Sequence, residues 1–443
     1  CPPRYCRTTL FRRTLVWCNH IAYHSSLLQI VANAGVAQQT AVVEATKILA
    51  RMRERTQLAY VWFAGSFLKR MFTKLFSSIR VREEDIARLK KQTVGKRVVY
   101  IPVSKTLLDP LLVWYVVIRY QLPVPSIVLD EGMEEFRVYT ILTLGPISDI
   151  LRLAGAYFIK RDVTSRSPLN TAVTAAYTQV LLREHDALSF VLEKARTRTG
   201  KVQAAYQDGL VNMILEATLE VNQSASLLKS NGIGADDEPA TPITPISPDG
   251  GNKIVTKDAV FVPINITYER IPELSALTDE VLDQRPRVSV PMNRLSVPLV
   301  APPSQAMVDR AKKVHNGTTG SELSDDGRFG RAFFGIGRLV SVQEVAGDEK
   351  LQKSIAFDTL KGQSRVVEKV TKAIQDGQRS AIIFSPVSLV AAIILNGRLF
   401  GGVQIGKIKD NLEWLRAEFK SKGVPIDWQG MPPMWKCVCA DNR

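Results

Sequence analysis

Short apolar segments alternate with longer amphipathic segments through the middle of the chain. Strand-like runs, each bounded by glycine, proline or charged residues, cover 97–103, 122–130, 155–160, 187–192 and 259–270. The segments between them, 107–119, 135–153 and 168–184, have helical patterns. Strands that alternate with helices in this way predict an α/β fold.

The flanking regions have different compositions and suggest the domain boundaries. Residues 1–40 form a predicted basic arm, and 41–91 interleave apolar with basic residues in a helical pattern. The α/β domain is predicted over 92–345, with Gly/Pro/Ser-rich insertions near 227–257 and 301–328. Residues 346–443 are predicted to form a C-terminal helical region and tail, with helices punctuated by Pro386 and Gly397.

The net charge of +15 is concentrated at the amino-terminal end. Residues 1–100 hold 18 lysines and arginines against five acids, whereas residues 101–443 hold 40 against 38. This asymmetry predicts an anionic partner, either RNA in a ribonucleoprotein particle or an anionic membrane surface. The predicted contact residues are Arg4, Arg7, Arg12, Arg13, Arg51, Arg53, Arg55, Lys69, Arg70 and Lys74. A third interpretation, in which the helices at 41–91 pack on the body and expose their arginines to solvent, stays open.

The amino-terminal end also bears on location. Four arginines precede Glu44, the first acid, which is similar to a mitochondrial targeting segment and predicts a mitochondrial protein. Because the sequence begins at Cys1, we expect further residues upstream. No run of 18 apolar residues occurs in the sequence, so we predict no membrane span. The five cysteines lie at positions 1, 6, 18, 437 and 439, which favours free thiols in a reducing compartment over a metal site joining the termini.

The first predicted strand–helix turn carries candidate chemistry. The segment VVYIPVSKTLLD (98–109) resembles motif I of the glycerol-3-phosphate and dihydroxyacetone-phosphate acyltransferases, a strand followed by Pro-x-His-x-x-x-x-Asp. In that family the histidine removes the proton from the acceptor hydroxyl, and the aspartate orients the imidazole. Here Ser104 stands in the histidine position and Asp109 in the aspartate position. A serine hydroxyl titrates far above neutral pH and cannot replace the imidazole as a base.

Three later segments resemble the same family in the same order. GAYFIKR (155–161) is similar to motif II, and FVLEKARTRTGK (190–201) to motif III, with Lys194 in place of a glycine. The resemblance implies phosphate binding by Lys160, Arg161, Glu193, Arg196, Arg198 and Lys201, since cations grip a substrate phosphate. Lysine at position 194 adds bulk where a glycine would allow a positive φ.

The strand FVPINITYER (261–270) is similar to motif IV, which implies that Pro263 lies near acyl-CoA. The sequences around 75–91 and 381–426 also resemble bacterial and peroxisomal members, so the match runs from about 68 to 428. The resemblance implies an acyltransferase-like mixed sheet flanked by helices. It implies no metal and no cofactor, with acyl-CoA as substrate or vestigial ligand.

Two functions fit these residues, and Ser104 separates them. The leading prediction is a pseudoenzyme that serves as a structural or assembly factor on an anionic partner, such as organellar RNA or a mitochondrial ribosomal particle. The alternative is an active, acyl-CoA-dependent sn-1 acyltransferase on glycerol 3-phosphate or dihydroxyacetone phosphate at a membrane surface. A ligand sensor that binds without turnover is a third hypothesis. Lys105 becomes a candidate base only if burial lowers its pKa.

Overall fold

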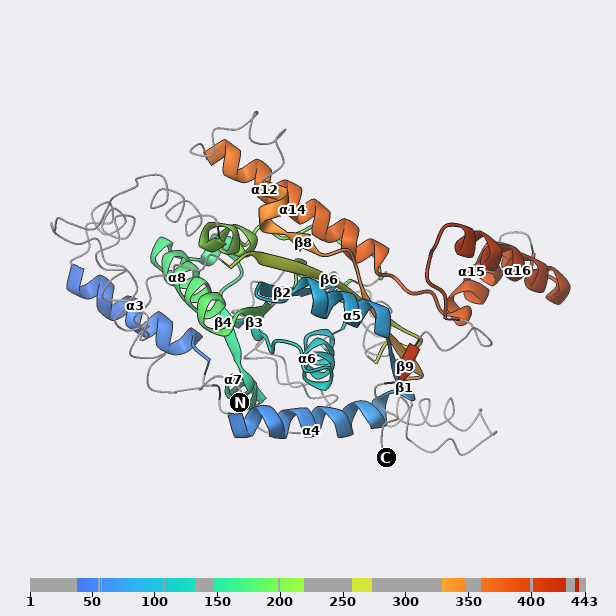
Figure 1. Cartoon of the computed structure of the whole chain (residues 1–443), viewed down its shortest axis with the longest axis horizontal. Helices are drawn as coiled ribbons and strands as arrows, with labels where there is room; N and C mark the ends of the chain where they lie inside the picture. Colours follow the sequence, from blue (N-terminus) through green and yellow to red (C-terminus); the bar gives the residue numbers. More distant parts are fainter. Residues whose placement is uncertain are drawn as a thin grey trace, which may run out of the picture.

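A computed structural model describes residues 38–54, 56, 58–106, 108–131, 147–197, 200–218, 257–272, 329–346, 360–398, 401–427 and 435–437. A mixed β-sheet with helices on both faces forms the centre of the molecule (Figure 1), which confirms the predicted α/β fold. The strands are β1 (Ser78–Arg82), β2 (Arg97–Pro102), β3 (Ser126–Asp130), β4 (Ala156–Ile159), β5 (Ala187–Ser189), β6 (Ala259–Tyr268), β7 (Arg331–Ile336), β8 (Val340–Ser341) and β9 (Trp435–Cys437). The helices are α3 (Gln38–Met52), α4 (Leu58–Leu75), α5 (Glu83–Gln92), α6 (Asp109–Arg119), α7 (Ile147–Ala154), α8 (Pro168–His185), α12 (Val342–Ala346), α14 (Leu360–Ser380), α15 (Pro386–Arg398) and α16 (Ile405–Ser421), with a further helix over 210–218.

The strand order determines which loops lie next to one another. Among the described strands it is β4-β3-β5-β2-β6-β7-β1-β9, and β8 also pairs with β6. The first five strands run parallel, so the loops that follow β4, β5 and β2 leave the same edge of the sheet. Strand β7 is antiparallel to β6, and β1 is parallel to β7.

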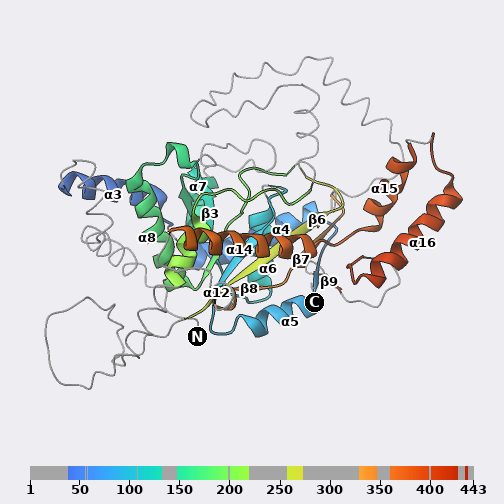
Figure 2. The ribbon, with the colours of Figure 1, turned by 90° about the horizontal axis from the view of Figure 1, so that it is seen from above.

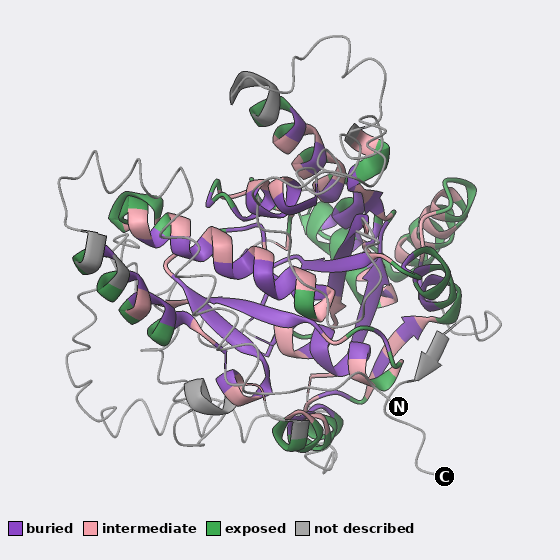
Figure 3. Ribbon diagram, turned by 60° about the vertical axis from the view of Figure 1, so that its left-hand side comes forward, coloured by how far each residue is buried: buried purple, intermediate pink, exposed green. Residues whose placement is uncertain are grey.

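Alternate residues of the strands pack into two separate cores. On β2, Val99 and Ile101 lie in a core with α3, α8 and α14, whereas Val98 and Tyr100 lie in a core with α4, α5 and α6. In Figure 1, α14 and α4 accordingly lie on opposite sides of the sheet, and Figure 2 shows α14 running across it. The central strands are buried in Figure 3, which explains their continuous apolar sequences.

One segment differs from its predicted structure. The pattern at 41–91 predicts helices throughout, but β1 separates α4 from α5 and adds a strand beside β7. Its sequence, SIRVR, buries Ile79 and Val81 and leaves the arginines half-buried, which is the two-residue period of a strand. The helical prediction for Ser78–Arg82 is therefore wrong, because the partner strand lies more than 200 residues away.

The last two long helices form a hairpin whose base is tied to the sheet. Phe384 and Ile426 bridge the chain before α15 and after α16, and the Asp427 carboxylate accepts hydrogen bonds from Arg80 (2.5 Å) and Arg331 (2.6 Å). Figure 1 shows this hairpin projecting from the body. The predicted insertion at 301–328, and all but residue 257 of the one at 227–257, lie outside the described residues.

Candidate active site

The motif I residues lie at the carboxyl edge of the parallel strands. Ser104 follows the end of β2, and its backbone carbonyl accepts a hydrogen bond from Thr197 N at 2.8 Å. Thr197 belongs to the loop after β5, the strand that pairs with β2. Ligands of open α/β sheets bind at this kind of edge, outside the carboxyl ends of the strands. The sheet topology thus brings two of the predicted motifs into direct contact.

Asp109 begins α6 and is fully buried. Its carboxylate accepts hydrogen bonds from the backbone N–H groups of Lys105 (2.6 Å) and Thr106 (2.7 Å), from the Thr106 hydroxyl (3.2 Å) and from the Tyr268 hydroxyl (2.5 Å). Burial raises the pKa of this carboxyl, and the hydrogen bonds oppose that shift. Asp109 therefore closes the strand–helix turn and fixes its shape.

Lys105 is buried beside this turn. Its ammonium nitrogen donates to Asn265 Oδ1 at 2.6 Å, and Asn265 in turn donates to the carbonyl of Gln378 on α14. Burial lowers the pKa of Lys105 to about 8, although the carboxyls of Asp109 and Glu193 oppose the shift. Asn265 and Tyr268 are site residues that the motifs do not identify. An asparagine inside the apolar strand β6 was the available signal, because a buried polar side chain needs a partner.

Glu193 of motif III reaches back to motif I. Its Oε2 accepts a hydrogen bond from Ser104 N at 3.4 Å. Glu193 as a whole is only 1% exposed. Burial raises the pKa of Glu193 to about 7, with a smaller upward contribution from Asp109, while Arg161 opposes the shift. A carboxyl that titrates near neutrality thus lies beside the position where the related motif has its histidine.

Arg161 stabilises the motif III loop through hydrogen bonds and an ion pair. Its guanidinium donates to the carbonyls of Val191 (3.0 Å) and Glu193 (3.1 Å) and forms an ion pair with Asp208 at 2.6 Å. The residue is buried, and every one of its nitrogens donates to a protein group. The geometry therefore assigns Arg161 to holding Glu193 in place, and its contact with a substrate phosphate stays a prediction.

The remaining predicted phosphate-binding residues surround this edge with different exposure. Lys160 and Arg196 are half-buried and Lys201 is exposed, whereas Arg198 lies outside the described residues. Lys194 is not among the non-glycine residues with positive φ, which in the described chain are Gln121 and Asp186. The strain expected at Lys194 is therefore absent, and its side chain lies over the ring of Tyr206 at 4.9 Å.

Pro263 is buried on β6 between β2 and α14. It pairs in register with Ile101, and Gly377 of α14 lies so close that an added Cβ would be 2.6 Å from Pro263 Cγ. Its predicted position near acyl-CoA is not tested by these contacts and stays a prediction.

The described histidine lies at the opposite edge of the sheet. His185 ends α8, and its Nδ1 is 2.9 Å from the hydroxyl of Ser126, the first residue of β3. Its Nε2 is 3.5 Å from the buried carboxylate of Glu54. His185 therefore cannot replace the imidazole at motif I, and the other three histidines lie outside the described residues.

The predicted basic surface is only partly described. Lys69, Arg70 and Lys74 are exposed on α4, as is Arg51 on α3, whereas Arg53 is half-buried. The predicted contacts outside the described residues are Arg4, Arg7, Arg12, Arg13 and Arg55. None of the described helices combines the length and hydropathy that a bilayer crossing requires.

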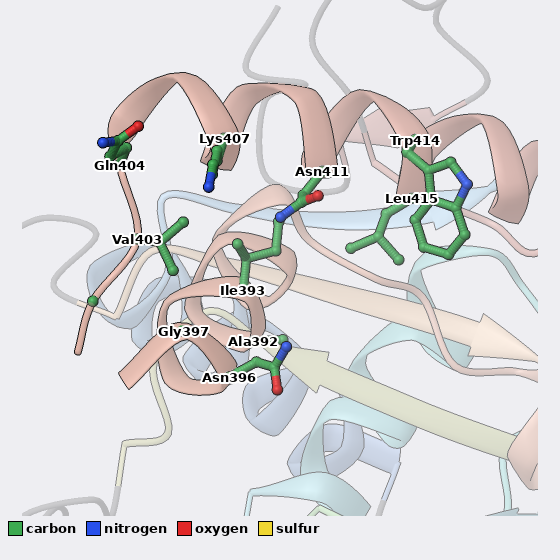
Figure 4. A pocket seen from close by; sticks show the side chains of 11 residues that line it. Ala392, Ile393, Asn396, Gly397, Val403, Gln404, Lys407, Asn411, Trp414 and Leu415 are labelled. Carbon is green, nitrogen blue, oxygen red and sulfur yellow. The ribbon is translucent and has the colours of Figure 1, made fainter. Parts of the chain in front are cut away.

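A cavity of about 620 Å³ lies away from these motifs, in the C-terminal hairpin. Figure 4 shows that α15, α16 and their connection line it, with Ile393, Val403 and Trp414 among the side chains. No motif residue contributes to this cavity. The described residues also contain no group of three His, Cys, Asp or Glu side chains that could hold a metal ion.

Comparison with known proteins gives the same assignment as the motifs. A family model described as acyltransferase matches residues 78–247. A dihydroxyacetone phosphate acyltransferase of Bos taurus is 23% identical over 394 residues, which cover 88% of this chain and 48% of that protein. The Homo sapiens protein of that name is 23% identical, with 90% and 49% covered. A glycerol-3-phosphate acyltransferase of Pasteurella multocida is 28% identical, with 42% and 21% covered.

The chain spans about half the length of the dihydroxyacetone phosphate acyltransferases that it matches. A solved structure, the 1-acyl-sn-glycerophosphate acyltransferase PlsC from Thermotoga maritima, aligns over 82% of this chain and 96% of that one. Its sequence identity is 12% and its TM-score 0.33. Residues 78–247 thus match an acyltransferase family model, and the chain as a whole is similar to the dihydroxyacetone phosphate and glycerol-3-phosphate acyltransferases, in agreement with the ordered motifs.

Proposed function

We propose that this protein transfers an acyl group from acyl-CoA to a hydroxyl of glycerol 3-phosphate or dihydroxyacetone phosphate. The observation that carries the proposal is the meeting of motif segments, separated by up to about 160 residues, at one edge of the sheet. Ser104, Glu193 and Asn265 belong to motifs I, III and IV, and each is hydrogen-bonded to one of the others or to the adjacent Lys105. The names of the relatives support the same substrate class.

The charges at this edge suit a phosphorylated acceptor. Lys105 is a buried cation whose ammonium group donates to Asn265, and Lys160, Arg196 and Lys201 lie on the adjacent loops. Cations close to a low-dielectric site bind phosphate strongly, because little water competes for the charge. The phosphate contacts themselves are part of the proposal.

An acyl-transfer assay tests it. The full chain is incubated with long-chain acyl-CoA and either glycerol 3-phosphate or dihydroxyacetone phosphate, and ester product and free CoA are both measured. We expect equal amounts of the two products, dependent on the acceptor. Thermal stabilisation by acyl-CoA without any ester would instead support the ligand-sensor hypothesis and would refute catalysis.

We also propose that α4 contacts an anionic membrane surface. Trp62 and Phe63 are 67% and 59% exposed, and Lys69, Arg70 and Lys74 are exposed further along the helix. Aromatic side chains with nearby cations favour the interface of anionic bilayers, where each cation contributes about 1 kcal/mol. Sedimentation with phosphatidylserine and phosphatidylcholine vesicles tests this, and a double change of Trp62 and Phe63 to serine should weaken the binding.

A non-catalytic function in mitochondria, on RNA or a ribosomal particle, is the second candidate. Ser104 favours it, and so does Asp109, whose carboxylate oxygens both accept hydrogen bonds from the protein. No imidazole–carboxylate pair is therefore present among the described residues of this turn. If about six phosphates were neutralised, log K would fall against log salt with a slope near −4 to −5 for duplex or single-stranded RNA. A slope near zero, together with acyl transfer, would eliminate this candidate.

A further inference from the structure

The carboxylate of Glu193 lies where the site lacks its usual base. We propose that Glu193 accepts the proton of the acceptor hydroxyl, so that the base comes from the loop after β5 and not from the loop after β2. This inference rests on the proposed acyl transfer. It concerns a role that the motif resemblance does not give to this residue, since the resemblance groups Glu193 with phosphate binding.

Three contacts fix the position of the Glu193 carboxylate. Strands β2 and β5 pair in parallel, with Tyr100 opposite Ser189, so the two loops emerge together. Glu193 Oε2 accepts from Ser104 N at 3.4 Å, and Thr197 N donates to the Ser104 carbonyl at 2.8 Å. The carboxylate therefore lies next to the backbone of the residue from which a histidine would extend. Arg161 holds the Glu193 carbonyl from the other side.

The second carboxylate oxygen has unused hydrogen-bonding capacity. Glu193 Oε1 is buried and has no hydrogen-bond partner among the described residues, and the same is true of the Thr197 hydroxyl. Buried polar atoms are nearly always paired, so an unpaired acceptor at the edge where ligands bind indicates a ligand group. The hydroxyl of an acceptor substrate has the donor that Oε1 lacks. Burial also raises the pKa of Glu193 to about 7, which is near the optimum for a base at neutral pH.

The neighbouring ionisable groups are less suited to the same task. Asp109 accepts four hydrogen bonds from the turn and from Tyr268, so both of its oxygens are occupied. Lys105 faces Asn265 and carries a proton below pH 8, so most of its population cannot accept one at neutral pH. Its charge instead stabilises the ionised form of Glu193.

The proposed step is balanced without another reactant. Glu193 takes the proton from the acceptor hydroxyl, and the oxygen attacks the thioester carbonyl carbon. A C–O bond forms and the C–S bond breaks, so that CoA leaves as a thiolate. A thiol has a pKa of about 8.5 in water, so a carboxyl that titrates near 7 can return the proton to the thiolate. The products are the acyl ester and CoA, with Glu193 ionised again.

Replacement by glutamine separates this role from a structural one. Glu193→Gln keeps the size of the side chain and an oxygen that accepts from Ser104 N, but it cannot accept a proton. We expect kcat to fall by about 10²–10⁴-fold. We also expect kcat/KM of the wild type to rise with pH through about 7, and this limb to disappear from the residual activity of the variant. Glu193→Asp should retain part of the activity with a shifted pH limb. Glu344→Gln, a change at an exposed carboxylate paired with Arg338, is the matched control and should leave both unchanged.

The outcomes distinguish the inference from the function on which it rests. No turnover by the wild-type chain would refute the proposed acyl transfer itself. Turnover that persists in a folded Glu193→Gln protein, with the same pH limb, would refute only the role of Glu193. Loss of activity in Lys105→Met, together with retention in Glu193→Gln, would transfer the role to Lys105. Circular dichroism and thermal melting show that each variant is folded before its rate is compared.

Discussion

The burial of Glu193 predicts a change of the free energy of unfolding with pH, which can be measured without substrate. The pKa of the carboxyl rises from 4.5 to about 7 on folding, so the folded protein holds a proton that the unfolded chain has already lost. Between these two values, a rise in pH favours the unfolded state, because the unfolded state binds fewer protons. Below pH 4.5 both states are protonated, and the effect is absent.

The magnitude follows from the width of this interval. Each pH unit corresponds to about 1.4 kcal/mol, so the interval of about 2.5 units lowers the free energy of unfolding by about 3 kcal/mol at pH 8. Glutamine does not titrate, so Glu193→Gln removes this loss. We expect the difference in free energy of unfolding, variant minus wild type, to increase by about 3 kcal/mol between pH 4.5 and pH 8.

Urea unfolding at several pH values, followed by circular dichroism, measures this difference. The fixed cost of the substitution cancels, because only the change with pH is used. Other titrating groups cancel as well, provided that they are unaffected by the change at position 193. Glu344→Gln, at a side chain that is 65% exposed, is the matched control for the substitution itself. A pH-independent difference between wild type and Glu193→Gln would refute the argument that burial perturbs this carboxyl.

Three further predictions concern the framework of the site, and urea unfolding measures each of them. Asp109→Ala should lower the free energy of unfolding by about 3–5 kcal/mol, because it leaves buried donors unpaired. Tyr268→Phe removes only one of these donors and should lower it by about 1–3 kcal/mol. Equal losses of stability in the two variants would contradict this reasoning. Arg161→Lys should cost about 2–4 kcal/mol, since an ammonium cannot keep the bonds to Asp208 and two carbonyls, and an unchanged stability would show that these bonds are dispensable. Gly335→Ala should cost about 3 kcal/mol, because its Cβ would lie 1.9 Å from the carbonyl oxygen of Ala381. Gly406→Ala meets no atom within 4 Å and should be neutral or stabilising.

The sequence was sufficient to predict the elements whose own pattern determines them. Strands β2 and β6 are continuous apolar runs because both of their faces are buried, and their sequences show this directly. Strand β1 is different, since SIRVR becomes a strand through pairing with β7 and β9. No local signal in residues 78–82 specifies partners that lie so far along the chain, so the helical pattern of the neighbours dominated the prediction.

The candidate site shows the same difference between features set by local sequence and features set by distant pairing. The motifs identified Ser104, Asp109 and Glu193 one by one, but not the hydrogen bond between Ser104 and Glu193, which depends on the pairing of β2 with β5. Burial of Lys105 was also unpredictable, because lysines are rarely buried and the adjacent residues give no sign of Asn265 across the turn. The perturbed pKa values of both groups follow from burial in the assembled site, so they could not be predicted from the sequence.

The serine at position 104 therefore does not by itself determine whether the site is active. In a parallel sheet, adjacent strands present their loops to the same space, and a proton acceptor from either loop can reach a ligand bound there. The loop after β5 offers a buried carboxyl with a free oxygen, and Arg161 and Ser104 hold it in place. Such a carboxyl reduces stability at neutral pH, and a chain retaining only the fold would gain by replacing it.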